Sequence, residues 1–285
     1  MSEKKNILIV GITGFLGRNL LNYIFNNLET NKYNIIGIAR DQEKIHSLKK
    51  IHNIKIYQID IVSQNIELEE LFTNNKIDYI LNTAALKYTD KCEKNPTLCV
   101  EVNLIGFINL LKLANKFNIK NMISISSDKA NKPINNYGMS KYLMHQISKQ
   151  HKYSIYEGVN FFWSDGSVLD IWYRQVKNKE NIYVTNFDQE RYFIDVDDVC
   201  KDIFDNIDKR DITIKSDNIY KVKLIDLFNS FTEYFKYDKT KCKIKGNRTN
   251  EKVSDEINQT FLNIDNKEIK NKIDKYVKNN LTIDV

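Results

Sequence analysis

Two short segments of the chain carry side chains whose types and spacing can move protons and a hydride. They are residues 126–130 (SSDKA) and 137–141 (YGMSK). Tyr137 and Lys141 share one face of a helix, where the ammonium lowers the pKa of the phenol. A Tyr and Lys pair beside a nicotinamide is a common arrangement for hydride transfer. Asp128 and Lys129 add a second acid and base, which indicates chemistry beyond oxidation and reduction alone.

An alternation of strands and helices in the first half of the chain must position these side chains. The strands are apolar throughout, which is typical of a parallel sheet covered on both faces. The pattern predicts an α/β fold, a doubly wound parallel sheet of the Rossmann type. We expect strands at 6–10, 34–39, 54–59, 78–82 and 121–126, and helices at 15–26, 42–50, 67–74, 98–117 and 136–151.

The pattern loosens beyond residue 160, which indicates a smaller C-terminal lobe. Shorter elements are expected there at 183–185, 195–206, 224–235 and 242–245. We therefore predict a dinucleotide-binding Rossmann domain over residues 1–159 and a substrate-binding lobe formed mainly by residues 160–285. Segments of the two can interleave.

Composition is that of a soluble enzyme with a sizeable core. Of the 285 residues, 42% are hydrophobic and 28% charged, and the net charge is +6. The charge is too small and too dispersed to indicate nucleic-acid binding. The Lys-rich run 267–278 also contains Glu268 and Asp274, which is typical of a solvated helix face.

The cysteines and the N-terminus favour a cytoplasmic protein. Cys92, Cys99, Cys200 and Cys242 form no C-x-x-C pair and have no His at zinc spacing, so we expect reduced thiols and no metal site. The N-terminal residues show no cleavable signal pattern. No apolar run approaches the ~20 residues that span a bilayer, so we expect no membrane association.

Residues 11–17 (GITGFLG) follow the first expected strand and open the first helix. Glycines there allow a tight turn and a close approach of the backbone to a pyrophosphate at the helix N-terminus. Arg40 ends the second strand, where an acidic residue would bind the ribose of NAD. Arginine suits a 2′-phosphate and favours NADP, although Asp41 can offset that preference. Asp60 ends the third strand and either meets the adenine amino group or is a turn residue.

These motifs resemble those of extended short-chain dehydrogenase/reductases, and among them the CapD-like branch of polysaccharide biosynthesis. Residues 82–87 (NTAALK) match its H-A-A-A-L-K strand end. Residues 127–130 followed by 133–138 match T-D-K-A…P-I-N-x-Y-G, the most specific of the set. Residues 93–96 (EKNP) and 101–106 (EVNLIG) match its E-x-N-P and x-x-N-V-x-G segments.

The resemblance continues through the second half of the chain. Residues 160–168 (NFFWSDGSV), 191–193 (RYF) and 246–252 (GNRTNEK) resemble N-V-x-x-S-R-G-S-V, R-F-F and G-x-R-P-G-E-K. Three departures stand out: Asn82-Thr83 replaces His-Ala, Thr249-Asn250 replaces Pro-Gly, and Asp165 replaces Arg. The last removes a positive charge near the expected phosphates.

Site residues follow from the motifs together with the resemblance. The catalytic set is Ser127, Asp128, Lys129, Tyr137 and Lys141. The cofactor set is Gly11, Thr13, Gly14, Phe15, Leu16, Gly17, Arg40, Asp60, Ile61, Ala84, Ala85, Lys87, Asn103, Tyr137 and Lys141. The substrate set is Lys87, Asn160, Ser167, Val168, Arg191, Arg248 and Glu251. In it Asn160, Arg191 and Arg248 would hold the diphosphate and uracil of a UDP-sugar, and Glu251 the ribose.

The resemblance implies an inverting UDP-N-acetylglucosamine 4,6-dehydratase (5-epimerase) with tightly bound NADP that is regenerated in each turnover. Tyr137 and Ser127 would act at the 4-hydroxyl, Lys129 at C5 and Asp128 at the leaving 6-hydroxyl. Two alternatives stay open: a UDP-N-acetylhexosamine 4-epimerase, and a non-catalytic NADP-binding sensor or scaffold. Relatives of this kind are commonly dimers or larger, so we also expect a homo-oligomer joined through the long helices that flank the sheet.

Overall fold

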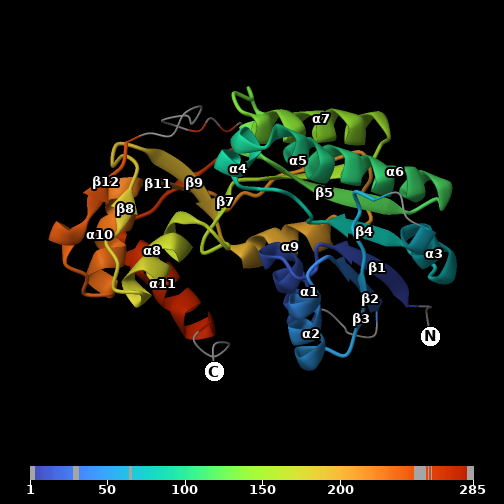
Figure 1. The fold of residues 1–285 in the computed structure, drawn as a ribbon, viewed down its shortest axis with the longest axis horizontal. Coiled ribbons are helices and arrows are strands. Elements are labelled where there is room, and N and C mark those ends of the chain that lie inside the picture. The colour runs from blue at the N-terminus through green and yellow to red at the C-terminus, as the bar shows by residue number, and fades with distance from the viewer. Residues whose placement is uncertain are drawn as a thin grey trace. The chain divides into compact units, whose positions relative to one another are not determined.

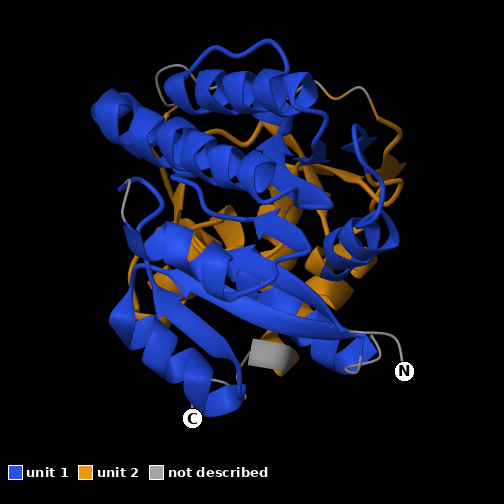
Figure 2. Cartoon of the chain, turned by 90° about the vertical axis from the view of Figure 1, so that its right-hand side faces the viewer, with its two compact units in different colours: residues 1–158, 197–215 blue, residues 159–196, 216–285 orange. Residues whose placement is uncertain are grey.

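A parallel sheet forms the centre of the first part of the chain. The computed structural model describes residues 4–27, 32–63, 66–246, 255, 257 and 259–280, which fall into two units. The first unit comprises residues 1–158 and 197–215, and the second comprises residues 159–196 and 216–285 (Figure 2).

The strand order of the first unit is β10-β6-β5-β4-β1-β2-β3, with every pairing parallel. This confirms the predicted doubly wound sheet, in which the order reverses between β1 and β4. Its strands are β1 (Lys5–Val10), β2 (Tyr33–Ala39), β3 (Lys55–Gln58), β4 (Tyr79–Asn82), β5 (Asn121–Ser127), β6 (Ser154–Gly158) and β10 (Thr213–Ile214).

Helices cover both faces of this sheet (Figure 1). One face packs on α3, α6 and α7 through residues such as Phe72, Leu110 and Met144. Below the sheet in Figure 1 lie α1, α2 and α9. The helices of the unit are α1 (Phe15–Asn27), α2 (Gln42–Ile51), α3 (Ile66–Asn74), α4 (Thr89–Lys94), α5 (Pro96–Val100), α6 (Gly106–Lys116), α7 (Asn136–Gln150) and α9 (Val196–Asp205), with the short turns η1 (Glu101–Ile105) and η2 (Asp128–Ala130).

The helix expected over residues 98–117 differs from the prediction in its middle. It begins at Pro96, widens into the π-helical turn η1, and continues as α6. Asn103 lies in that wide turn. Single π-turns inside α-helices often mark functional sites.

The same stretch corrects the expectation that no apolar segment is long enough to span a bilayer. Pro96–Lys116 is 21 residues long and apolar enough by length and composition. Half of its most apolar window is buried inside the protein, where Phe107, Leu110 and Leu111 pack in the core. A core helix of a soluble protein has the same length and composition, so this is weak evidence for a membrane span.

The second unit is built around a four-stranded sheet with the order β13-β11-β9-β7 and a two-stranded sheet of β12 and β8. Its core is rich in aromatic rings, among them Trp172, Phe228 and Phe231. Its elements are β7 (Asn160–Phe161), α8 (Val168–Lys177), β8 (Tyr183–Val184), β9 (Glu190–Ile194), β11 (Tyr220–Lys223), α10 (Leu224–Tyr234), η3 (Lys239–Lys241), β12 (Lys243–Ile244), β13 (Leu262–Asn263) and α11 (Asn266–Asn280).

The two units interleave along the chain. Residues 197–215, expected in the C-terminal lobe, belong to the first unit because β10 extends the parallel sheet beside β6. The hydroxyl of Ser154 and the amide of Asn121 also donate to the carbonyl of Lys209, at 2.7 Å each.

Candidate active site

The turn that follows β5 gathers three of the predicted catalytic side chains. The Asp128 carboxylate is buried and accepts hydrogen bonds from the Ser127 hydroxyl at 2.6 Å and the Lys129 amide at 2.9 Å. Its Oδ1 also lies 3.2 Å from the Lys129 ammonium. A buried carboxylate is costly unless it is paired and hydrogen-bonded, and here it is both. A hydroxyl, a carboxylate and an ammonium are thus held in fixed contact.

Helix α7 supplies the other two catalytic candidates. Asn135 caps its first turn by accepting from the Gly138 amide at 2.8 Å. Tyr137 and Lys141 are both buried, and the Lys141 ammonium donates to the carbonyl of Ile125 on β5 at 2.8 Å. Asn135 was not predicted as a site residue, although an Asn directly before a helical pattern is a typical cap.

The electrostatics of Tyr137 differ from the sequence-based expectation. Burial raises the pKa of the Tyr137 phenol to about 12, the Lys129 ammonium opposes this shift, and Asp128 adds to it. Burial also lowers the pKa of Lys141 to about 8. The prediction that Lys141 lowers the phenol pKa is therefore wrong. Desolvation dominates, and the cation that acts on Tyr137 is Lys129.

Asn103 connects the strand end after β4 to α7. Its carbonyl accepts from the Leu86 amide at 2.7 Å, and its amide donates to the Leu86 carbonyl at 3.1 Å and to the Ser140 hydroxyl at 3.0 Å. Ser140 in turn donates to the carbonyl of Tyr137 at 2.7 Å. Leu86 and Ser140 were missed from the sequence because their partners are distant along the chain.

The turn between β1 and α1 fits a dinucleotide phosphate. Gly11 has φ +77°, a conformation that side chains disfavour, and its carbonyl accepts from the Gly14 amide at 2.9 Å. A Cβ at Gly17 would lie 2.5 Å from the Gly11 carbonyl oxygen, so glycine is needed for α1 to approach the strand. Such a turn directs backbone N–H groups at an anion. Thr13, Phe15 and Leu16 complete it.

The remaining predicted cofactor residues lie after other strands of the same sheet. Arg40 follows β2 and Asp60 follows β3, and their side chains approach to 3.7 Å. The Asp41 carboxylate caps α2 by accepting from the Lys44 amide. Since parallel strands present their carboxyl ends at one edge, these residues share an edge with Ile61 after β3 and with Ala84, Ala85 and Lys87 after β4.

The predicted substrate residues that the structure describes lie in the second unit, except Lys87. The Asn160 amide donates to the Tyr192 carbonyl at 2.9 Å, and Ser167 caps α8, which begins at Val168. Arg191 lies in β9 with its Nε 3.5 Å from Asp255. Asn160 and Ser167 therefore make backbone contacts. Arg248 and Glu251 lie outside the described residues.

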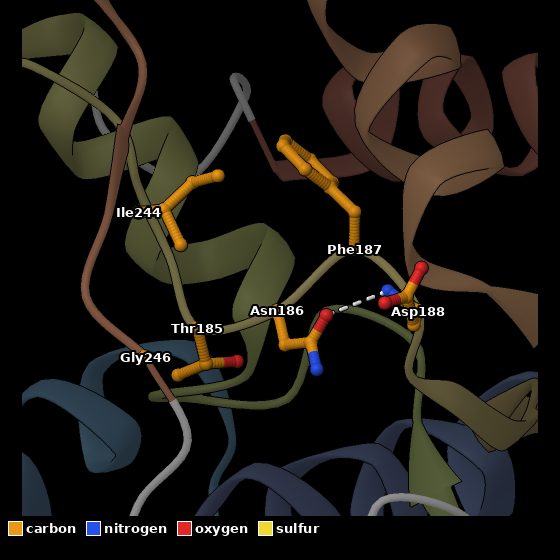
Figure 3. A pocket seen from close by; sticks show the side chains of 6 residues that line it. All are labelled: Thr185, Asn186, Phe187, Asp188, Ile244 and Gly246. Atoms are coloured by element: carbon orange, nitrogen blue, oxygen red, sulfur yellow. Dashed lines mark hydrogen bonds between the residues drawn. The ribbon is translucent and has the colours of Figure 1, made fainter.

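The second unit also contains an open cavity of about 360 Å³ that was not predicted (Figure 3). Asn186 accepts from the Asp188 amide at 2.9 Å, and the Phe187 ring lies 5.1 Å from that of Phe228. Polar groups and an aromatic ring thus line one hollow. Its lining residues are Thr185, Asn186, Phe187, Asp188, Ile244 and Gly246.

Over the ranges that the structure describes, no cluster of three His, Cys, Asp or Glu side chains could hold a metal ion. Cys92 and Cys99 are buried free thiols that pack against Tyr137. Burial raises the pKa of Cys92 well above that of an ordinary thiol. A thiol in such surroundings is unreactive.

Comparison with known proteins agrees with this geometry. The family described as polysaccharide biosynthesis protein matches residues 7–278. The chain belongs to this family. Its fold is that of the extended short-chain dehydrogenase/reductases: DesIV, a dTDP-glucose 4,6-dehydratase from Streptomyces venezuelae solved with NAD and TYD, superposes with a TM-score of 0.82 at 12% identity, covering 96% of this chain and 98% of that one.

Two curated relatives of the chain carry different activities in their names. The inverting UDP-N-acetylglucosamine 4,6-dehydratase of Campylobacter jejuni is 26% identical over 219 residues, covering 73% of this chain and 65% of the relative. A UDP-glucose 4-epimerase of Rickettsia bellii is 27% identical over 211 residues, covering 70% and 61%. The matches thus span less than two thirds of either relative.

The buried Lys141 predicts a pH-dependent stability difference. Its folded pKa of about 8 lies below that of an ordinary lysine, so folding at pH 7 carries the cost of a buried ammonium. That cost falls as the pH rises through the folded value toward the unfolded value. The free energy of unfolding of wild type should therefore rise by roughly 2 kcal/mol relative to that of Lys141→Met between pH 7 and 10.

Urea unfolding of both proteins at several pH values measures this difference, and the exposed Lys49→Met is the matched control. If the difference in free energy of unfolding between wild type and Lys141→Met stays constant from pH 7 to 10, the lowered pKa of Lys141 is contradicted.

Proposed function

We propose that the protein is an NADP-dependent UDP-N-acetylglucosamine 4,6-dehydratase that inverts C5 and works in the cytoplasm. Its product would be a UDP-2-acetamido-2,6-dideoxy-L-hexos-4-ulose for surface polysaccharide. The observation that carries the proposal is the buried Asp128 carboxylate, paired with the half-buried Lys129, beside Tyr137 and Ser127. A hydride transfer alone needs Tyr137 and Lys141, whereas elimination of water needs a further base and acid.

In the first phase the residues of α7 and the end of β5 act at C4 of the sugar. Tyr137, as the phenolate, takes the proton of the 4-hydroxyl, and Ser127 donates a hydrogen bond to the same oxygen. The nicotinamide, when bound, supplies the hydride chemistry, accepting a hydride from the sugar and returning it later. Lys141 lies one helical turn from Tyr137 and binds the cofactor. The resulting ketone at C4 acidifies the hydrogen on C5.

In the second phase the turn after β5 removes water. Lys129, as the free amine, takes the C5 proton, and Asp128, as the acid, protonates the leaving 6-hydroxyl. The C5–H and C6–O bonds break, and one water leaves. With the nicotinamide bound, hydride would add to C6, and a proton from water would add to the opposite face of C5, which would invert that centre.

We assign cofactor binding to the first unit and UDP binding to the second. Arg191 supports the second assignment, because a guanidinium fork suits diphosphate oxygens. The cavity lined by Phe187, Asn186 and Thr185 adds an aromatic ring with neighbouring polar groups, which suits a nucleotide base. The sequence match also assigns Arg248 and Glu251 to this ligand.

A 4-epimerase acting on a UDP-sugar is the second candidate, and the Rickettsia relatives favour it. It uses the same first phase with Tyr137, Lys141 and Ser127. It differs in returning the hydride to C4 with no loss of water.

Mass spectrometry of UDP-N-acetylglucosamine after incubation with the NADP-loaded enzyme separates these functions. The dehydratase removes one water from the sugar, and NMR in D2O should show deuterium at an inverted C5. Lys129→Met should lower the rate of dehydration at least about 100-fold, because no base then reaches C5. An isomer of unchanged mass would support the epimerase. An unchanged substrate with NADP still bound would support a non-catalytic sensor or scaffold.

Arg40 should set the preference for NADP over NAD. Its guanidinium follows β2 and is exposed, and the carboxylate of Asp41 is occupied as a helix cap. Arg40→Ala should weaken NADP binding by about tenfold while NAD binding changes less than about threefold, since only NADP carries the 2′-phosphate. Calorimetric titration measures both. Lys44→Ala removes one nearby positive charge as the control. Equal losses for NADP and NAD would contradict the assignment.

The apolar faces of α5 and α7 support a homo-oligomer formed with a second copy of this chain. Both helices lie together on one face of the sheet (Figure 1). Exposed apolar side chains lie one helical turn apart on α7 and near the end of α5. They are Met139, Tyr142 and Leu143 on α7, with Leu98, Val100 and Ile105 on α5 and η1.

Light scattering coupled to gel filtration should report at least a dimer for wild type. Leu143→Glu should give a monomer, because a charge would be buried at the centre of the interface. Ile51→Glu, on an exposed position of α2, is the control. A wild-type monomer at micromolar concentration would overturn this interface.

A further inference from the structure

Glu157 is a buried carboxylate that the proposed mechanism does not use. It lies near the carboxyl end of β6, in register with Ser126 on β5, and is only 5% exposed. Burying a carboxylate is costly unless it is paired and hydrogen-bonded. Its oxygen Oε1 accepts from the Asn131 amide at 2.9 Å and lies 3.9 Å from the Lys215 ammonium. The shorter contact, with Asn131, links Glu157 to the turn that follows β5.

Asn131 closes that turn. Its backbone amide donates to the Asp128 carbonyl at 3.0 Å, and its side-chain amide donates to Glu157. The opposite side of the turn is fixed by α7, because a Cβ on Gly138 would overlap the carbonyl oxygen of Lys129. The turn is therefore held between α7 on one side and β6 on the other.

We propose that Glu157 is a positioning residue that fixes Asp128 and Lys129 through Asn131. It orients the pair without touching the substrate. The catalytic role of Glu157 rests on the proposed function, in which Asp128 and Lys129 are the acid and the base of dehydration. The restraint of Lys129 itself is inferred from the hydrogen bonds alone.

A purely stabilising pair between Glu157 and Lys215 is the competing interpretation. The Lys215 side chain is 37% exposed and its ammonium is beyond hydrogen-bond distance from Glu157 Oε1. An exposed or half-exposed ion pair contributes little. If stability alone were involved, loss of Glu157 would lower the melting temperature and leave the chemistry of Lys129 unchanged.

The experiment compares Glu157→Ala, Glu157→Gln, Asn131→Ala and the Glu157→Ala/Asn131→Ala double variant, in the full chain loaded with NADP. Asp78→Asn is the matched control: Asp78 is also a buried carboxylate paired with a lysine, Lys120, but it precedes β4, at the other end of the sheet strands. Two readouts are taken. One is the rate of acetylation of Lys129 by acetic anhydride without substrate, normalised to the exposed Lys49. The other is deuterium exchange at C5 of UDP-N-acetylglucosamine, compared with the absorbance of reduced nicotinamide.

Loss of the restraint should raise Lys129 acetylation at least about threefold and lower C5 exchange about tenfold, while the reduced-nicotinamide signal changes less than about twofold. Glu157→Gln keeps an acceptor for Asn131 and should stay within about twofold of wild type in both readouts. Asn131→Ala should match Glu157→Ala, and the double variant should be no worse than either single one. Asp78→Asn should leave both readouts unchanged.

Unchanged acetylation and C5 exchange in Glu157→Ala and Asn131→Ala would overturn the proposal. If Glu157→Ala does not fold, Asn131→Ala and Glu157→Gln give the same decision. A wild-type enzyme that leaves UDP-N-acetylglucosamine unchanged would contradict the proposed function, and the acetylation readout would still decide whether Glu157 restrains Lys129.

Discussion

The site depends first on the burial of one carboxylate. Asp128 has almost no exposed surface, and an unpaired charge there would destabilise the fold. Ser127 and the amide and ammonium of Lys129 satisfy it, at 2.6 Å, 2.9 Å and 3.2 Å. The chain can meet these contacts only in a tight turn at the end of β5. That requirement places an ammonium, a carboxylate and a hydroxyl in contact.

The second support of the site is α7, which is fixed against the strands of the sheet by hydrogen bonds. The Lys141 ammonium is buried and held by the Ile125 carbonyl, so β5 and the helix are joined by a hydrogen bond as well as by apolar packing. The π-turn carrying Asn103 adds a link from α7 to the strand end after β4 through Ser140 and Leu86. The ends of β4 and β5 are therefore both connected to α7 by short polar contacts, each between residues far apart in sequence.

Spacing along the chain predicted the local part of this arrangement. That part comprises the interval between Tyr137 and Lys141, the glycines of 11–17 and the strand predicted over 121–126, which the structure extends to Ser127. Each depends on neighbours within one or two turns. Spacing could not show burial, so the shift of the Tyr137 pKa was expected in the wrong direction. It also could not reveal Glu157, whose partner Asn131 is 26 residues away. For Asn160 and Ser167, matching motifs marked constrained positions, and the structure shows backbone contacts at both.

The two supports also explain how one fold can serve both activities named among the relatives. Under the proposed function, proton removal at C4 uses side chains of α7, whereas removal of water uses the turn after β5. The turn is closed by Asn131 and contacts α7 at Gly138, and its Ser127 and Lys129 side chains also act on the Tyr137 phenol. A change in the turn would therefore affect the proposed elimination most directly and the hydride step through Tyr137. Because the proposed first step is common to dehydratases and epimerases, the proposed difference between the two reactions lies in whether the turn residues also remove water.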